Sequence, residues 1–242
     1  MKEARYFYAP DAQVSNELPA EEAAHALRVL RLAVGDELFL IDGKGSFYRA
    51  EVTMAAGKHC HYTIIEQLPQ QKYWRGHLHL VIAPTKDIGR IEWMVEKATE
   101  IGFDEISFVN SRFCERKSLR TDRIEKIVVA AMKQSRKAWK PIVNPMASFE
   151  EIMSRNISGS RFICHCYEEV ERCDFFNTLQ QPDSPEDITV MIGPEGDFSI
   201  DEVKRATSNG YLSASLGVAR LRTETAGLSA MMMMQMARRL LN

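Results

Sequence analysis

The alternation of apolar and polar residues changes about a third of the way along the chain. In the first part, the short runs 36–43 and 47–54 alternate in part, and Gly43-Lys44-Gly45 between them suits a hairpin turn. A short helix is expected around Glu21–Leu30. The polar stretch 69–72 breaks both periodicities and is the expected linker. The pattern therefore predicts a small β-rich domain over residues 1–70.

Beyond the linker, strand-like and helix-like segments take turns. Five apolar runs are predicted strands: 78–84, 106–110, 161–167, 188–192 and 212–216. Residues at helical spacing fall between them and at the end of the chain, in 91–101, 121–131 and about 223–241. Capping boxes at Ser148/Glu151 and Ser199/Glu202 start two more helices. Strands interleaved with helices predict a second domain, 74–242, with a parallel sheet covered on both faces.

Two glycine-bearing loops stand out in this second domain. Each follows a predicted strand and leads into a helix: one contains Gly193 and Gly196, and the other contains Gly217. Loops beyond the carboxyl ends of parallel strands are where α/β sheets bind ligands, although glycine also serves simple turn geometry. The chain lacks GxGxxG after a strand, GxxxxGK[ST] and HExxH, which disfavours a Rossmann nucleotide site, a P-loop enzyme and a metalloprotease. The pattern favours a cofactor site of another kind.

Charge is distributed unevenly along the chain. The formal net charge is −2, yet residues 112–140 hold ten Lys or Arg against three acids. A cationic stretch on an acidic protein is typical of phosphate recognition, whereas a solvated helix face is the alternative. The stretch therefore favours a nucleic-acid partner.

The cysteines and the amino end bear on compartment and metals. Five cysteines without CxxC spacing indicate reduced thiols and a cytoplasmic protein. No apolar run is long enough to span a membrane, and no export signal is recognised. Cys164-His165-Cys166 is spaced too closely for a usual zinc site, so no metal is expected.

Several segments carry a resemblance to a known family. "IGPEGDFS" at 192–199 and "LGVARLRTETA" at 216–226 closely resemble the last two loops of the SPOUT RNA methyltransferases of RsmE type. "HALRVLRLAVGDEL" at 25–38 and "KQSRKAWKP" at 133–141 extend the likeness over nearly the whole chain. The resemblance implies an α/β fold with a carboxyl-terminal trefoil knot, preceded by a small PUA-like β-barrel. It also implies transfer of a methyl group from S-adenosylmethionine to uridine N3 in 16S ribosomal RNA of the small subunit.

The resemblance also implies a cofactor site built from the two loops and a preceding strand end. The residues carried over by position are Cys166, Tyr167, Gly193, Pro194, Glu195, Gly196, Leu216, Gly217, Leu221 and Arg222. His165 belongs to the same strand end. The family commonly has a second glycine where this chain has Asp197, a mild departure.

Uridine N3 must lose a proton, and a neighbouring cation favours the anion. Arg222 and Arg136 are the candidates for that role, and Glu224 is a candidate to accept the proton or to orient Arg222. A structural Arg222–Glu224 ion pair, with Thr223 as helix N-cap, is the alternative.

RNA contacts are expected from the first domain and from the cationic stretch. His25, Arg28 and Arg31 have three-residue spacing on one predicted helical face. The full set of RNA-binding candidates is Arg5, His25, Arg28, Arg31, Arg116, Arg120, Arg136 and Lys137. Tyr6 is a candidate to stack on a base, while Phe7 is expected to pack in the core.

The last helix carries Met231–Met234 and Met236, which cover more than one helical face. Since the resembled family is homodimeric through its final helix, a homodimer is expected. Two other functions stay open: a SPOUT methyltransferase acting on another RNA base or ribose, and a non-catalytic RNA-binding factor of ribosome assembly. Cofactor binding discriminates the second of these from an enzyme.

Overall fold

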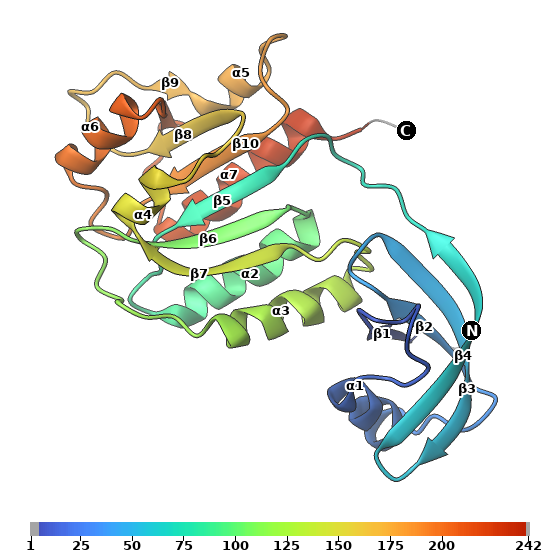
Figure 1. Cartoon of the computed structure of the whole chain (residues 1–242). Coiled ribbons are helices and arrows are strands. Elements are labelled where there is room, and N and C mark those ends of the chain that lie inside the picture. The colour runs from blue at the N-terminus through green and yellow to red at the C-terminus, as the bar shows by residue number, and fades with distance from the viewer. Residues whose placement is uncertain (1–4, 241–242) are drawn as a thin grey trace. The chain divides into compact units, whose positions relative to one another are not determined.

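The computed structural model describes residues 5–240 and divides into two compact units. Unit 1 comprises the chain up to Lys72 together with Val129–Lys140, and unit 2 comprises Tyr73–Val128 and the chain from Pro141 onward. Figure 1 shows the elements of both units along the chain. Among the described residues, no helix has the length and apolarity to cross a membrane.

Unit 1 is built on a four-stranded sheet in the order β1-β2-β3-β4. Its strands are β1 (Tyr6–Tyr8), β2 (Glu37–Ile41), β3 (Ser46–Ala56) and β4 (His59–Pro69). The hairpin between β2 and β3 confirms the turn predicted at Gly43–Gly45. Residues alternate between a buried and an open face, and Phe7 packs in the core as expected.

The helix of unit 1 differs from the prediction. Helix α1 (Ala20–Ala24) passes into a π-helical turn, η1 (His25–Val29), in which Leu30 N–H donates to the His25 carbonyl at 3.1 Å. Arg31 lies beyond the helix with a φ of 54°. The expectation that His25, Arg28 and Arg31 share one helical face is therefore wrong, because the wider turn and the helix end break the three-residue repeat.

Residues 129–140, which the pattern assigned to the second domain, cluster with unit 1. Backbone hydrogen bonds join Gly45 N–H to the Ala138 carbonyl at 3.0 Å and Lys140 N–H to the Gly43 carbonyl at 2.9 Å. Lys133 also pairs with Glu22 at 2.5 Å. The Gly43–Gly45 turn is thus hydrogen-bonded to a segment that is distant in sequence. Periodicity within one segment does not reveal such a contact.

Unit 2 contains a seven-stranded sheet in the order β7-β6-β5-β10-β8-β11-β9. The strands are β5 (Leu78–Ile82), β6 (Glu105–Asn110), β7 (Ile142–Ser148), β8 (Ser160–Cys164), β9 (Cys173–Asp174), β10 (Ile188–Ile192) and β11 (Leu212–Ser215). Every neighbouring pair is parallel, so the predicted parallel sheet is confirmed. Strands β7 and β9 lie at the edges and were not predicted; β7 contains Pro145, which is tolerated at an edge.

Helices cover both faces of this sheet, as predicted (Figure 1). They are α2 (Ile88–Ile101), α3 (Thr121–Gln134), α4 (Phe149–Ser154), α5 (Phe175–Leu179), α6 (Ile200–Ser208) and α7 (Thr223–Arg238). On β5, Leu80 and Ile82 join the core under α2 and α7, whereas Val81 joins the core under α4 and α6. The alternating burial explains why the strand is apolar at every position.

The helix boundaries follow local signals closely. Both predicted capping boxes form, at Ser148 for α4 and Ser199 for α6. Gly102 ends α2 with a φ of 103°. Arg222, not Thr223, is the N-cap of α7, and it makes no side-chain cap hydrogen bond. The predicted last residue of this helix, Leu241, lies outside the described residues.

Candidate cofactor site

A cavity of about 530 Å³ opens in unit 2 where β8, β10 and β11 end. The lining residues come from those strand ends, the two glycine loops and the first turns of α2 and α7. They are Arg90, Cys164, His165, Cys166, Arg172, Ile192, Gly193, Pro194, Glu195, Gly196, Asp197, Ala214, Ser215, Leu216, Gly217, Ala219, Arg220, Leu221, Arg222, Thr223 and Ala226. The two loops therefore meet at one site, as the carboxyl ends of parallel strands require.

The first loop is a tight turn that leaves no room at Gly193. Asp197 N–H donates to the Pro194 carbonyl at 2.9 Å, which closes the turn. A Cβ on Gly193 would lie 3.0 Å from Phe198 N and 3.1 Å from the Asp197 carbonyl carbon. Only glycine fits without moving the backbone, so this position lets the loop fold back beside the cavity.

The conformation of Asp197 explains how it replaces the glycine that the resembled family commonly has at this position. Its φ of 66° lies in the left-handed region, which glycine favours and aspartate tolerates. Its carboxylate accepts the N–H groups of Phe198 at 2.7 Å and Cys166 at 2.8 Å. Asp197 thus ties the first loop to the end of β8, a link that glycine lacks.

The second loop leads from β11 into α7. Gly217 has a φ of 120°, and a Cβ there would meet open space, so the backbone conformation alone requires glycine. Leu216 and Leu221 line the cavity half-buried. Arg222 lines it with an exposed side chain at the start of α7. Apolar surface and a cation are therefore adjacent here.

The end of β8 supplies the third wall. His165 is 5% exposed, and burial lowers its pKa, so its ring is neutral. Its Nδ1 accepts the Tyr167 N–H at 3.3 Å, which leaves the proton on Nε2, a buried atom with no hydrogen-bond partner. Cys166 lines the cavity, but Tyr167 does not. The Tyr167 hydroxyl donates to the Phe198 carbonyl at 2.8 Å and so links the end of β8 to the first loop.

Glu224 finds a partner that was not predicted. Its Oε1 lies 3.4 Å from Nη1 of Arg90, at the start of α2, and its Oε2 is buried without a hydrogen bond. Arg90 also lies 3.8 Å from Asp87. Among the residues that the structure describes, no ion pair joins Arg222 to Glu224, so the alternative of a structural Arg222–Glu224 pair is wrong. The pairing spans 134 residues, which sequence spacing does not show.

The cationic residues of unit 2 fall into two kinds. Arg116 is half-buried, and its guanidinium donates to the carbonyls of Thr85 at 3.1 Å and Lys86 at 2.6 Å. Arg120 is exposed and paired with Asp122 at 2.7 Å. Arg116 therefore supports the loop after β5, while Arg120 is open to solvent.

In unit 1, His25, Arg28 and Arg31 are exposed, and Arg5 is half-buried next to β1. Arg136 lies over the Tyr6 ring, 5.3 Å from its centroid. Tyr6 itself stacks on Phe39 at 5.3 Å. The exposed Arg136 and the half-buried Tyr6 thus form a cation–aromatic pair, and Lys137 follows Arg136 in sequence.

The lining of the cavity suits a small molecule with both apolar and polar parts. Backbone of the two glycine loops, apolar side chains and four arginines line it; the arginines are Arg90, Arg172, Arg220 and Arg222. The buried Nε2 of His165, another lining residue, lacks a hydrogen-bond partner. A small molecule with both apolar and charged parts therefore fits that lining. The sequence had not indicated Arg90 or Arg172, which donates to the His165 carbonyl at 2.8 Å.

Comparison with known proteins decides the family. A model of an RNA methyltransferase domain matches residues 72–235, and a model of an RNA methyltransferase PUA domain matches residues 18–65. This chain belongs to the RNA methyltransferase family. The resemblance to the RsmE type is thereby confirmed.

Individual relatives extend over nearly all of this methyltransferase. The structure of a probable rRNA-methyltransferase from Porphyromonas gingivalis is 41% identical, with a TM-score of 0.88 and coverage of 97% of this chain and 98% of that chain. A ribosomal RNA small subunit methyltransferase E from Neisseria gonorrhoeae, solved bound to S-adenosyl methionine, is 26% identical, with a TM-score of 0.84 and coverage of 96% and 97%. The small subunit methyltransferase E of Rickettsia conorii is 28% identical over 216 residues, which is 88% of this chain and 86% of that protein.

Proposed function

We propose that this protein transfers a methyl group from S-adenosylmethionine to N3 of a uridine in 16S ribosomal RNA of the small subunit. The observation that carries the proposal is the cavity formed by the two glycine loops in a member of the RNA methyltransferase family. Relatives named ribosomal RNA small subunit methyltransferase E support the RNA, and the Neisseria relative supports the cofactor. Position N3 comes from the resemblance of the loops at 192–199 and 216–226 to the RsmE type.

The cavity residues fit the cofactor. S-adenosylmethionine, when bound, supplies an electrophilic methyl carbon on a positively charged sulfur. The backbone around Gly193 and Gly217 would take the adenine and ribose, and the buried Nε2–H of His165 would donate to an acceptor on that side. Holding nucleophile and carbon in line is worth about 7–11 kcal/mol of barrier lowering, so positioning is the main task of these residues.

The residues at the start of α7 act on the uridine. Arg222 is exposed at the cavity and lowers the cost of the N3 anion by its charge. Glu224 forms an ion pair with Arg90 that joins the first turns of α2 and α7. Its role is either this structural one or acceptance of the N3 proton by Oε2, which has no hydrogen-bond partner. Arg136, in unit 1, is the second candidate cation for stabilising the N3 anion.

RNA recognition is assigned to domain 1–70 and to the cationic stretch. The exposed His25, Arg28 and Arg31 and the cation–aromatic pair of Arg136 with Tyr6 support this assignment. Arg120 and Lys137 add phosphate contacts, and Arg5 lies next to the first strand. The proposal follows from exposure and charge, because arginine recognises both phosphates and planar bases.

The finer features of fold and assembly follow from the same resemblance. We expect unit 1 to be a PUA-like barrel and the segment after β8 to form a trefoil knot in domain 74–242. A homodimer through α7 is supported by its two faces: Met231 and Met234 are buried, whereas Met232 and Met236 are 43% and 48% exposed. Since its substrate is ribosomal RNA and its five cysteines are free, we expect it in the cytoplasm.

The test is methyl transfer from labelled S-adenosylmethionine to undermethylated small subunits and to free 16S RNA, followed by nucleoside analysis. Label in 3-methyluridine is the expected result. Label in another nucleoside or in ribose overturns the position and keeps the cofactor. No transfer together with no cofactor binding favours a non-catalytic assembly factor.

A further inference from the structure

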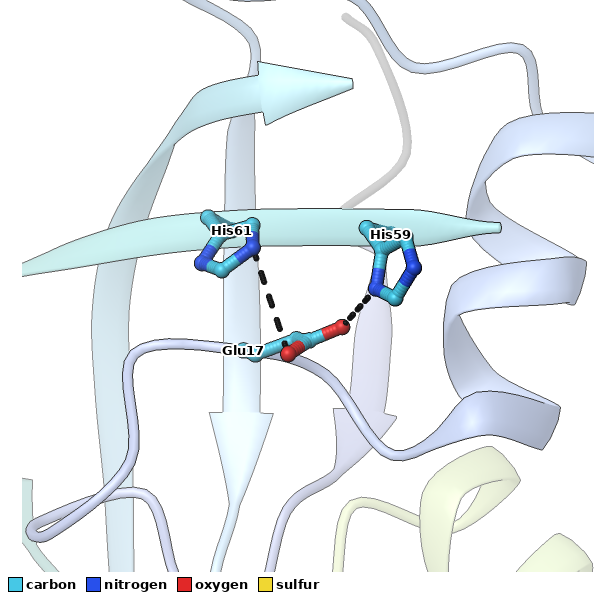
Figure 2. Close-up of side chains that lie close together, drawn as sticks. All are labelled: Glu17, His59 and His61. Carbon is cyan, nitrogen blue, oxygen red and sulfur yellow. Dashed lines mark hydrogen bonds and ion pairs between the residues drawn. The ribbon is translucent and has the colours of Figure 1, made fainter. Parts of the chain in front are cut away.

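One end of β4 in unit 1 brings two imidazoles and a carboxylate together. His59 and His61 flank the fully buried Cys60, so both rings extend from the opposite, open face of the strand. Glu17 comes from the segment before α1 and forms a β-bridge with His61. Figure 2 shows the Glu17 carboxylate directed between the two rings.

The three side chains have ligand-like separations. Glu17 Oε1 lies 2.6 Å from His59 Nδ1, and Glu17 Oε2 lies 3.9 Å from His61 Nε2. One donor atom from each residue lies within 4.8 Å of the others. Ligands on a tetrahedral ion with metal–nitrogen bonds of about 2.0–2.1 Å are roughly 3.4 Å apart. His59 is exposed and Glu17 and His61 are partly exposed, so their side chains have room to rotate toward a shared ion.

The backbone that carries these residues is fixed by hydrogen bonds. Leu18 N–H donates to the Cys60 carbonyl at 2.9 Å, and Tyr62 N–H donates to the Asn16 carbonyl at 2.8 Å. The segment around Glu17 is therefore held beside β4 by an isolated antiparallel β-bridge. The donor positions are set before any ligand arrives, which reduces the cost of ordering them.

We propose that Glu17, His59 and His61 form a binding site for a divalent transition metal ion of the zinc class. Two imidazoles and one carboxylate are a ligand set that such ions prefer. His59 is 65% exposed, which leaves the remaining coordination positions open to water. No metal was expected from the sequence, where only Cys164-His165-Cys166 suggested one. Glu17 lies 42 residues from His59, and sequence spacing does not show that they meet.

A second histidine pair shows that composition alone does not make such a site. His77 and His79 have the same spacing at the start of β5, with Glu105 2.8 Å from His77. Yet His79 is 3% exposed, its Nε2 is bonded to Ser107 at 2.9 Å, and burial lowers its pKa to about 4. Its ring is committed to the core, whereas the His61 ring has no hydrogen-bond partner in the described part of the chain.

The test is a titration of the full chain with Zn²⁺ by calorimetry at neutral pH. One ion per chain is expected, and Glu17→Gln, His59→Gln and His61→Gln should each weaken binding by about tenfold or more, since each removes a ligand. His77→Gln controls for histidine content, and Cys166→Ser controls for the exposed thiol. Both controls should bind Zn²⁺ as the unaltered chain does.

Imidazole NMR spectra of the unaltered chain make the test independent of variant folding. Substoichiometric Zn²⁺ should shift the ring resonances of His59 and His61 together. Absence of binding overturns the proposal. So does binding that survives in His61→Gln, or binding that is lost in Cys166→Ser.

Discussion

The two units expose their functional groups in opposite ways. Unit 2 surrounds a cavity of about 530 Å³ with loop backbone and strand ends. Unit 1 carries its cations and histidines on open surface, as at Arg28 and His59. A small cofactor is held by enclosure, while an RNA surface is recognised by accessible charge and stacking.

This difference decides which substitutions matter in each unit. A binding site formed by closely packed backbone loses affinity when a single Cβ is added where there is no room for it, even though no charge changes. A surface built from separate side chains loses affinity in small steps, one contact at a time. Substitutions in one unit should therefore leave the other unit's binding unchanged.

The largest effect is expected at Arg222. Arg222→Ala should lower single-turnover methyl transfer about 10²–10³-fold, the usual cost of losing one group that stabilises developing charge. Arg222→Lys should restore part of the rate because it keeps the charge. Arg205→Ala, which removes an exposed arginine 3.4 Å from Glu150, should stay close to the unaltered rate. An unchanged rate in Arg222→Ala removes Arg222 from the mechanism.

Gly193 tests the enclosure itself. Gly193→Ala would place a Cβ 3.0 Å from Phe198 N, so the loop must shift. We expect S-adenosylmethionine affinity, measured by calorimetry, to fall about tenfold or more, or roughly 1.4 kcal/mol. RNA affinity should not change. Gly57→Ala in unit 1 is the control: its φ of 63° makes alanine strained there too, but a Cβ meets nothing within 4 Å and the site is in the other unit, so cofactor affinity should stay intact.

A buried histidine in unit 2 should make stability depend on pH. Burial lowers the pKa of His79 from 6.5 to about 4, so below pH 6.5 the unfolded chain binds a proton that the native chain does not. The contribution of His79 to the free energy of unfolding should be complete above pH 6.5. As the pH falls from 6.5 to about 4, the free energy of unfolding should decrease by up to about 1.4 kcal/mol per pH unit. Urea unfolding of the unaltered chain and His79→Gln at about pH 7 and pH 5 checks this. Equal pH dependence in the two proteins contradicts it.

The smallest effect is expected on the surface of unit 1. Arg28→Ala should weaken RNA binding several-fold and reduce the slope of log affinity against log salt by about 1, because one phosphate contact is lost. Filter binding over a series of KCl concentrations measures both. Arg49→Ala is the control, since Arg49 is already paired with Glu66 at 3.3 Å and Glu37 at 3.6 Å. A loss of cofactor affinity in Arg28→Ala contradicts the separation of the units.

The sequence allowed the two glycine loops that line the cavity to be predicted because their signals are local. Gly193 follows the fully buried β10, Gly217 follows the short strand β11, and the capping box at Ser199 starts the next helix after Gly193. Local signals failed where partners are distant. The Arg90–Glu224 pair joins helices far apart in the chain, and the attachment of residues 129–140 to unit 1 depends on backbone bonds to a hairpin. The π-helical turn at His25–Val29 replaced an expected α-helix, with no residue pattern to mark it.

Reverse transcription of 16S RNA tests the proposed function most directly. A methyl group on uridine N3 removes the pairing donor, so the transcript should stop at the modified nucleotide. In cells that lack this protein the stop should be absent, and the unaltered gene should restore it whereas Arg222→Ala should not. A stop that persists without the protein, or that the unaltered gene does not restore, contradicts methylation of uridine N3 by this chain.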